Sequence, residues 1–254
     1  MDWAKAKTIL IIALIITDIF LLYNYVSGHR GSGEIDNTEM LMTVLSESGI
    51  NISEIPEGHQ DMPALTVKHV DTDDETIMAL IESVDITVDS DEHDKESAYI
   101  EAASDFIEYL GMMSIHAEAE YEALSDSNRN NNTANADALV RFRCFRNNYE
   151  VDGSYMVCTF DNGKLTGFES NWLEPVEFSR KKLPTISASV ALITYMTDHI
   201  AEDVVTIEEM DMVYWVSPDY YEGGSVMTDT ALPAWRIVLD DGRHIHIDAI
   251  ELTQ

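Results

Sequence analysis

Three side chains near the C-terminus have the types and spacing of metal ligands. His244, His246 and Asp248 alternate with other residues, so on a β-strand they share one face. Imidazole and carboxylate groups bind zinc, but a zinc site also needs a fourth ligand or a water, and hydrogen bonds that orient the ligands. A terminal hairpin with a polar outer face explains the same pattern. We therefore predict no metal site at these residues.

Two acidic runs contain the ligand types that calcium prefers. They are residues 71–75 (DTDDE) and 89–92 (DSDE). Neither run has the glycine and the glutamate that an EF-hand loop needs at its sixth and twelfth positions. Solvated acidic loops explain both runs, so we expect the chain to bind no cofactor.

The sequence lacks the short motifs of common enzyme active sites. It contains no G-x-S-x-G nucleophile motif, no P-loop and no H-E-x-x-H zinc motif. Paired carboxylates are uninformative here, because the chain has 47 Asp and Glu residues. We therefore predict that the protein is not an enzyme.

The formal net charge of −32 excludes one class of partner. A chain this acidic is repelled by nucleic-acid phosphates, so we predict that it binds no nucleic acid. A solubilising surface explains the charge. A basic partner surface or loosely bound divalent cations are the alternatives.

The two cysteines could form a disulfide or remain ordinary thiols. The midpoint between Cys144 and Cys158 is Val151, beside the turn-forming residues Asp152 and Gly153. A hairpin at this turn would bring the two thiols together on adjacent strands, but the strand register cannot be read from the sequence. Both alternatives therefore stay open.

An apolar segment near the N-terminus predicts a membrane anchor. Residues 8–26 are almost entirely apolar, and at about 1.5 Å each they span about 28 Å, close to the hydrocarbon thickness of a bilayer. Lys5 and Lys7 precede this segment and favour a cytoplasmic N-terminus. We therefore expect a single-pass protein of the cell membrane, with residues 1–7 in the cytoplasm, a linker at 27–33 and the remainder outside. A cleaved signal peptide is the alternative, although the apolar run is longer than a usual signal core.

Asp18 lies within the apolar segment, where a carboxylate is costly and seldom faces lipid. Ala13, Thr17 and Asn24 recur along one side of the same expected helix. Small and polar residues are common where membrane helices contact each other. These four residues are therefore predicted to bind a second helix. The alternative is a plain anchor in which Asp18 has no partner.

The spacing of apolar residues predicts the elements that follow the linker. Helical spacing predicts one helix that follows the capping residues 36–39 and ends at Gly49, and two more over 95–112 and 187–200. The acidic runs and the short apolar segment between them, residues 71–94, indicate a hinge region. Asp161, Asn162 and Gly163 indicate a hairpin turn. The predicted strands cover residues 50–52, 64–70, 114–124, 138–146, 155–160, 164–172, 207–216, 234–239 and 244–250.

A helix followed by antiparallel strands occurs twice in this order of elements. The pattern predicts an α+β fold, in which a single N-terminal transmembrane helix precedes an extracytoplasmic domain. That domain is expected to contain two helix-plus-antiparallel-sheet units, at residues 34–175 and 176–254. Trp172, Tyr214 and Trp235 fall on predicted strands, where packing in a core or between the two units explains them.

The N-terminal sequence resembles the YycI family of membrane-anchored regulators in Gram-positive bacteria. The similar residues are Met1-Asp2-Trp3, Lys5, Lys7-Thr8-Ile9 and Asp18-Ile19-Phe20-Leu21-Leu22, and the closing Pro233-Ala234-Trp235-Arg236 hairpin is also similar. The resemblance implies a regulator of the cell-wall two-component system. It implies that the partners are the sensor histidine kinase and a YycH-like regulator, bound through transmembrane and extracytoplasmic contacts. A membrane-tethered extracellular inhibitor or wall-binding module without kinase contact is the alternative.

Overall fold

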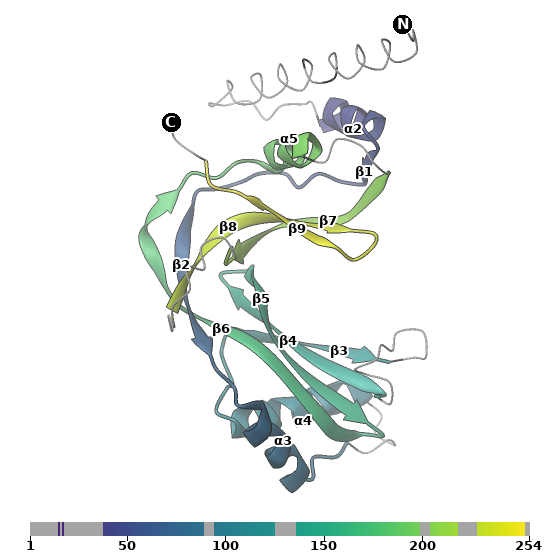
Figure 1. The fold of residues 1–254 in the computed structure, drawn as a ribbon, viewed down its shortest axis with the longest axis vertical. Helices are drawn as coiled ribbons and strands as arrows, with labels where there is room; N and C mark the ends of the chain where they lie inside the picture. Colours follow the sequence, from purple (N-terminus) through teal and green to yellow (C-terminus); the bar gives the residue numbers. More distant parts are fainter. Residues whose placement is uncertain are drawn as a thin grey trace, which may run out of the picture. The chain divides into compact units, whose positions relative to one another are not determined.

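The computed structural model describes Ile15, Thr17 and residues 38–88, 94–124, 136–198, 204–217 and 228–251. The labelled helices of this part of the chain are α2 (Thr38–Glu47), α3 (Asp74–Ser83), α4 (Lys95–Tyr109) and α5 (Ala188–Asp198) (Figure 1). Its strands are β1 (Ile50–Ile52), β2 (Met62–Val70), β3 (Ala117–Ala123), β4 (Ala138–Arg146), β5 (Tyr149–Asp161), β6 (Lys164–Leu183), β7 (Val205–Trp215), β8 (Thr228–Leu239) and β9 (His244–Asp248).

The strands form one mixed sheet in the order β1-β7-β8-β2-β6-β5-β4-β3, with β9 paired to β8. β1 and β7 are parallel, and β5 is parallel to β7 where Val151 lies opposite Tyr214. About half of the described chain is strand and about a quarter is helix. The predicted α+β class with two antiparallel units is therefore wrong, and the fold is mostly β. Apolar spacing identifies strands, but it carries no information about which strands pair.

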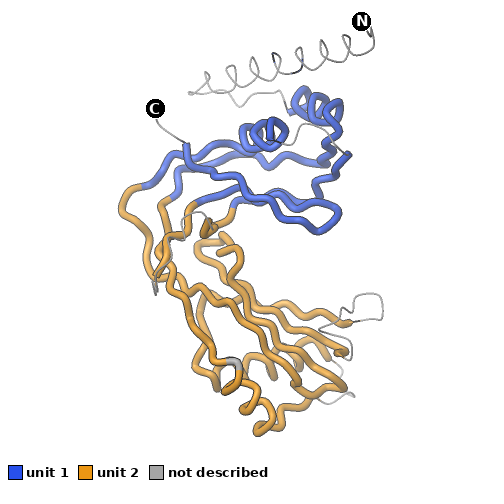
Figure 2. The backbone as a smooth tube through the Cα atoms, viewed as in Figure 1, with its two compact units in different colours: residues 1–62, 182–212, 233–254 blue, residues 63–181, 213–232 orange. Residues whose placement is uncertain are grey.

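The chain divides into two compact units, each assembled from separate segments (Figure 2). The predicted units, 34–175 and 176–254, were each continuous in the chain. β6 continues to Leu183 instead of ending near Trp172, so it contributes residues to both units. Unit 1 contains residues 1–62, 182–212 and 233–254, and unit 2 contains residues 63–181 and 213–232.

In unit 1, α2 and α5 cover one face of the sheet (Figure 1). Leu45 of α2, Leu192 of α5 and Ile237 of β8 are fully buried in their common core. Trp235 also packs in this core, and its indole N–H donates to the Ile186 carbonyl oxygen at 3.0 Å. That bond satisfies a polar group whose burial would otherwise be destabilising.

In unit 2, α4 packs on one face of the antiparallel strands β3 to β6. Phe106 of α4 is fully buried, and its ring centroid lies 5.6 Å from that of Phe168 on β6. β5 and β6 are joined by the predicted hairpin turn. Asn162 and Gly163 have φ angles of 50° and 77° there, as a type I′ turn requires.

α3 occupies part of the segment for which a hinge was predicted, so that prediction is wrong. Ile77 and Ile81 of α3 are buried, and their spacing of four places them on one face of the helix. Residues 74–83 offer only a short apolar stripe between acidic flanks, which is why the sequence pattern did not separate this helix from a loop.

Residues 8–26, for which a membrane anchor was predicted, lie outside the described residues except for Ile15 and Thr17. Both of these residues are helical. None of the helices in the described part of the chain is long and apolar enough to cross a bilayer.

Candidate functional site

The residues predicted to bind a second helix are mostly outside the described ranges. Ala13, Asp18 and Asn24 belong to the undescribed positions, and Thr17 is helical and exposed. Their role therefore stays a prediction from the sequence.

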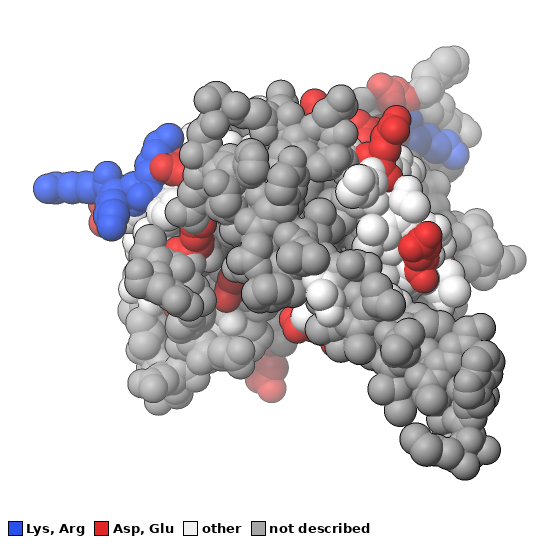
Figure 3. Space-filling model, turned by 90° about the horizontal axis from the view of Figure 1, so that it is seen from above, with Lys and Arg blue, Asp and Glu red and all other residues white. Residues whose placement is uncertain are grey.

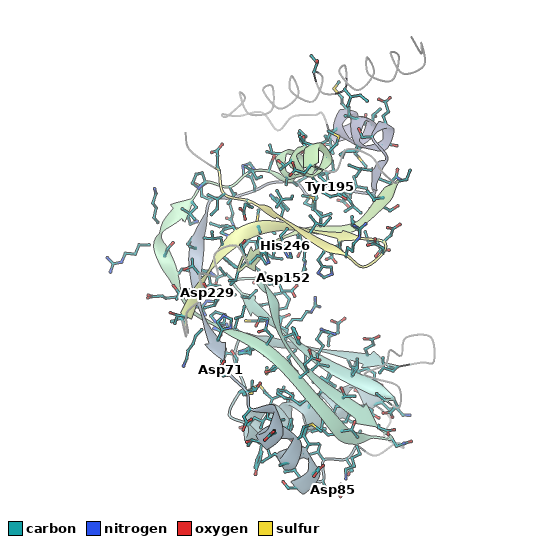
Figure 4. The ribbon with its side chains drawn as sticks, in the orientation of Figure 1. Asp71, Asp85, Asp152, Tyr195, Asp229 and His246 are labelled. Carbon is teal, nitrogen blue, oxygen red and sulfur yellow. The ribbon has the colours of Figure 1, made fainter. Side chains whose placement is uncertain are left out.

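The three residues with metal-ligand spacing lie on β9 of unit 1, where Figure 4 labels His246. In the antiparallel register, His246 is opposite Arg236 of β8. Arg236 is buried, and its Nε and Nη2 donate to the Asp211 carboxylate at 3.0 and 2.8 Å. Among the residues that the structure describes, no three His, Cys, Asp or Glu side chains are placed to hold a metal.

Cys144 and Cys158 are free and buried. β4 and β5 turn at Asn147 and Asn148, which both have positive φ, and not at Val151. This register places Val140, rather than Cys144, opposite Cys158. The pKa of Cys144 is raised to about 12, mainly by burial, and burial also raises the pKa of Cys158. The two side chains are ordinary thiols that stay protonated at neutral pH.

The strongest candidate site is the segment that joins α4 to β3, residues 110–116, which we name the α4–β3 loop. Its first turn is a helix cap. The Gly111 N–H donates to the Glu108 carbonyl oxygen at 2.9 Å, and the Met112 N–H donates to that of Ile107 at 3.0 Å. Gly111 has a φ of 69°, which glycine adopts without strain at the end of a helix. The direction in which the chain leaves α4 is therefore fixed.

A carboxylate of β6 holds the middle of the α4–β3 loop. Glu174 accepts hydrogen bonds from the Ser114 hydroxyl at 3.0 Å and from the Trp172 indole N–H at 2.7 Å, one on each oxygen. The Ser114 hydroxyl in turn accepts from the His116 N–H at 3.1 Å. Hydrogen bonds to an ionised acceptor are stronger than neutral ones. Ser114 is thus fixed by a residue 60 positions away in the sequence.

The end of the α4–β3 loop is attached to β4 and β6. The His116 carbonyl oxygen accepts a hydrogen bond from the Phe145 N–H at 2.7 Å. The imidazole Nε2 of His116 lies 2.8 Å from Nη1 of Arg146. Because a guanidinium can only donate, the imidazole nitrogen is the acceptor. The Arg146 guanidinium also lies 5.5 Å from the ring centroid of Phe178, which is within cation–π range.

This anchored segment exposes large apolar side chains to solvent. Ile115 is 94% exposed and Met113 is 44% exposed, and Tyr109 at the end of α4 is 65% exposed. Single exposed apolar residues are common, but a group of them on a fixed segment marks interaction surfaces. Because the backbone is already held in place, a partner would bind it with little loss of conformational entropy.

Two glutamates flank this group in the sequence. Glu108 and Glu118 are exposed on either side of the loop in the sequence. The face of the molecule seen from above, in Figure 3, shows Asp and Glu side chains at separate places and a group of Lys and Arg side chains at its left; it does not identify the α4–β3 loop. An apolar centre with acidic neighbours is complementary to a partner surface that has an apolar pocket and basic residues around it.

The sequence patterns did not single out the α4–β3 loop, although one signal was present. Residues 110–115 (LGMMSI) contain no charged side chain, whereas 24% of the chain is charged. We predicted a helix to Met112 and a strand from Ser114, and such elements would bury these apolar residues. The structure ends α4 at Tyr109 and begins β3 at Ala117, so the residues between them are free to face solvent.

Comparisons with known proteins assign no family to this chain. No family model matches it, and no curated protein matches it either. Among the solved structures that match, an uncharacterized protein from Eubacterium rectale is 11% identical, with a TM-score of 0.44. That alignment covers 78% of this chain and 85% of the other chain. A likeness of this degree supports no conclusion about fold or function.

Proposed function

We propose that this protein is a regulator that acts by binding other proteins, and that its principal partner is the sensor histidine kinase of a cell-wall two-component system. The observation that carries the binding role is the anchored α4–β3 loop with its exposed Met113 and Ile115, next in the chain to the exposed Tyr109 of α4. The identity of the kinase, a YycH-like second partner and a location at the cell membrane rest on the N-terminal sequence and its resemblance to the YycI family.

The proposed mechanism is a shift of the kinase between its signalling states. A contact that is tighter in one state moves the equilibrium by the difference between the two binding free energies. Burying a side chain as exposed as Ile115 contributes about 2 kcal/mol, which is about thirtyfold in affinity. One such side chain in a matching pocket would therefore bias the kinase substantially.

The test is capture of the kinase by the full-length chain from its native membrane after crosslinking. A Met113→Ser, Ile115→Ser double variant should capture at least tenfold less kinase, because it removes the exposed apolar group and leaves the anchoring bonds of Ser114 and His116 in place. Met78→Ser is the matched control. Met78 is a methionine of α3 that is 45% exposed, so its replacement should leave capture unchanged.

Equal capture by the double variant and the control would refute the role of the α4–β3 loop. Absence of any sensor kinase among the captured proteins, with wild-type chain as bait, would refute the kinase as partner.

A further inference from the structure

β3, which begins directly after the α4–β3 loop, has a free edge in the described part of the molecule. It pairs with β4 on one side and is the last strand of the sheet order (Figure 1). The N–H and C=O groups on the outer side of such a strand can pair with the backbone of another chain. An exposed sheet edge is therefore a template for strand addition.

β3 has one of the features that protect an edge strand from pairing and lacks others. Proteins block edges with charged side chains, especially lysine, and with proline, a β-bulge or a very short strand. β3 carries three glutamates, but it has no lysine, no proline and no bulge. The sequence of β3 is AEAEYEA, and its seven residues pair with β4 in an unbroken register from Ala117–Cys144 to Ala123–Ala138. The outer edge of β3 is consequently uninterrupted over seven residues and long enough to accept a strand.

Three glutamates mark one face of this edge. Glu118, Glu120 and Glu122 alternate along β3 and are all exposed. Arg143 of β4 contacts Glu120 at 3.1 Å and is shared with Glu150 at 3.6 Å. Among the described residues, no ion pair involves Glu118 or Glu122. Two carboxylates at the edge are therefore available to cations on an incoming strand.

The same glutamates disfavour pairing with a second copy of this chain. Antiparallel pairing of two β3 strands about their centre would place Glu118 opposite Glu122 and Glu120 opposite Glu120. Side chains that face each other on adjacent strands have Cβ atoms about 5 Å apart, and like charges at this distance are destabilising. A strand with cations at alternate positions would instead place opposite charges there.

We propose that the β3 edge binds an extended basic segment of a partner protein by strand addition, with Lys or Arg at alternate positions facing Glu118 and Glu122. This inference rests on the proposed function, because it describes the chemistry of the segment that a protein partner would supply. The edge follows the α4–β3 loop directly in the chain, so the two can belong to one interface.

The first test uses a synthetic probe, the blocked peptide Lys-Val-Lys-Val-Lys-Val-Lys, and the full-length chain in detergent. Fluorescence anisotropy measures binding, and hydrogen exchange of the β3 amides reports the site. The peptide should bind and protect amides of β3. The same peptide with alternate amides N-methylated should bind at least tenfold more weakly, because methylation removes the strand hydrogen bonds while the charges remain.

Two double charge-reversal variants then distinguish binding of the peptide at the β3 edge from general attraction of a basic peptide to an acidic protein. Glu118→Lys with Glu122→Lys should weaken peptide binding about tenfold. Glu82→Lys with Glu101→Lys makes the same change in net charge on exposed positions of α3 and α4 and should leave binding unchanged. Equal effects of the two double variants, or equal binding of the N-methylated peptide, would overturn the proposal.

Kinase capture by the same variants shows whether a negative result contradicts only the β3-edge proposal or also the proposed function. If Glu118→Lys with Glu122→Lys weakens peptide binding about tenfold and also reduces kinase capture, the edge is the binding site of the partner segment. If kinase capture depends on Ile115 but is unchanged by the two charge reversals, the proposed function stands and the edge proposal is wrong.

Discussion

Replacing Glu174 by alanine should release the α4–β3 loop and destabilise unit 2. The Glu174 carboxylate accepts hydrogen bonds from Ser114 at 3.0 Å and from Trp172 at 2.7 Å. Trp172 is 2% exposed, so water cannot readily replace the lost acceptor, and a buried donor without a partner costs about 1–3 kcal/mol. Adding the lost bond of the partly buried Ser114, we expect the free energy of unfolding to fall by about 3 kcal/mol.

Glu174→Gln is the matched control for this prediction. The glutamine carbonyl oxygen can accept from the Trp172 indole, and the amide nitrogen can donate to the Ser114 hydroxyl. The charge of the acceptor is lost and the hydrogen bond to Ser114 reverses its direction, but both contacts remain, so we expect a decrease of about 1 kcal/mol. In both variants the exposed side chains of Met113 and Ile115 are retained.

The assay is urea unfolding followed by tryptophan fluorescence. For a slope of about 3 kcal/mol/M, the alanine variant should lower the midpoint by about 1 M and the glutamine variant by about 0.3 M. Hydrogen exchange at the His116 amide, which donates to the Ser114 hydroxyl, should become faster in the alanine variant. Equal midpoints for the two variants, with slow exchange at His116 in both, would refute the anchoring role of Glu174.

Three further predictions follow from the cores and turns. Phe106→Ala should lower the free energy of unfolding by about 4 kcal/mol, measured by urea unfolding, because it empties a fully buried position. Gly163→Ala should cost about 2 kcal/mol more than Gly153→Ala. Both glycines have positive φ, but an added Cβ lies 2.5 Å from the Val88 carbonyl oxygen at position 163 and meets nothing within 4 Å at position 153. Because burial raises the pKa of Cys144 from 9.0 to about 12, the unfolded chain releases this proton first as the pH rises. Stability should therefore fall between about pH 9 and pH 12, and a urea midpoint whose pH dependence is unchanged in Cys144→Ala would contradict this assignment.

Local elements were largely predictable because their signals lie within a few residues. α2, α4 and α5 have apolar residues at helical spacing, and the Asn162–Gly163 turn has the residue types that positive φ requires. α3 was missed because its apolar stripe is short. The full lengths of β5 and β6 were missed because the parts beyond the predicted strands contain residues that usually indicate turns or strand ends, Asp152 and Gly153 in β5 and Pro175 in β6.

The candidate site was less predictable than the elements around it. Met113 and Ile115 have the composition of core residues, and their exposure depends on where α4 ends and β3 begins. The anchoring bond joins Ser114 to Glu174, which is 60 positions away. A pairing of this kind has no periodicity, so it leaves no mark in the local sequence.

The sequence by itself determined the acidic charge, the apolar N-terminal segment, and the type of most helices and strands. Those properties depend on composition or on neighbours within one or two turns of chain. The tertiary structure decided that β1 and β7 are parallel and that Cys144 and Cys158 are not opposite each other. It also decided that the apolar side chains of the α4–β3 loop are exposed and that β3 is the last strand in the sheet order of the described residues. Strand pairing and exposure are set by contacts between residues that are far apart in the chain, and a single sequence does not record which distant residues meet.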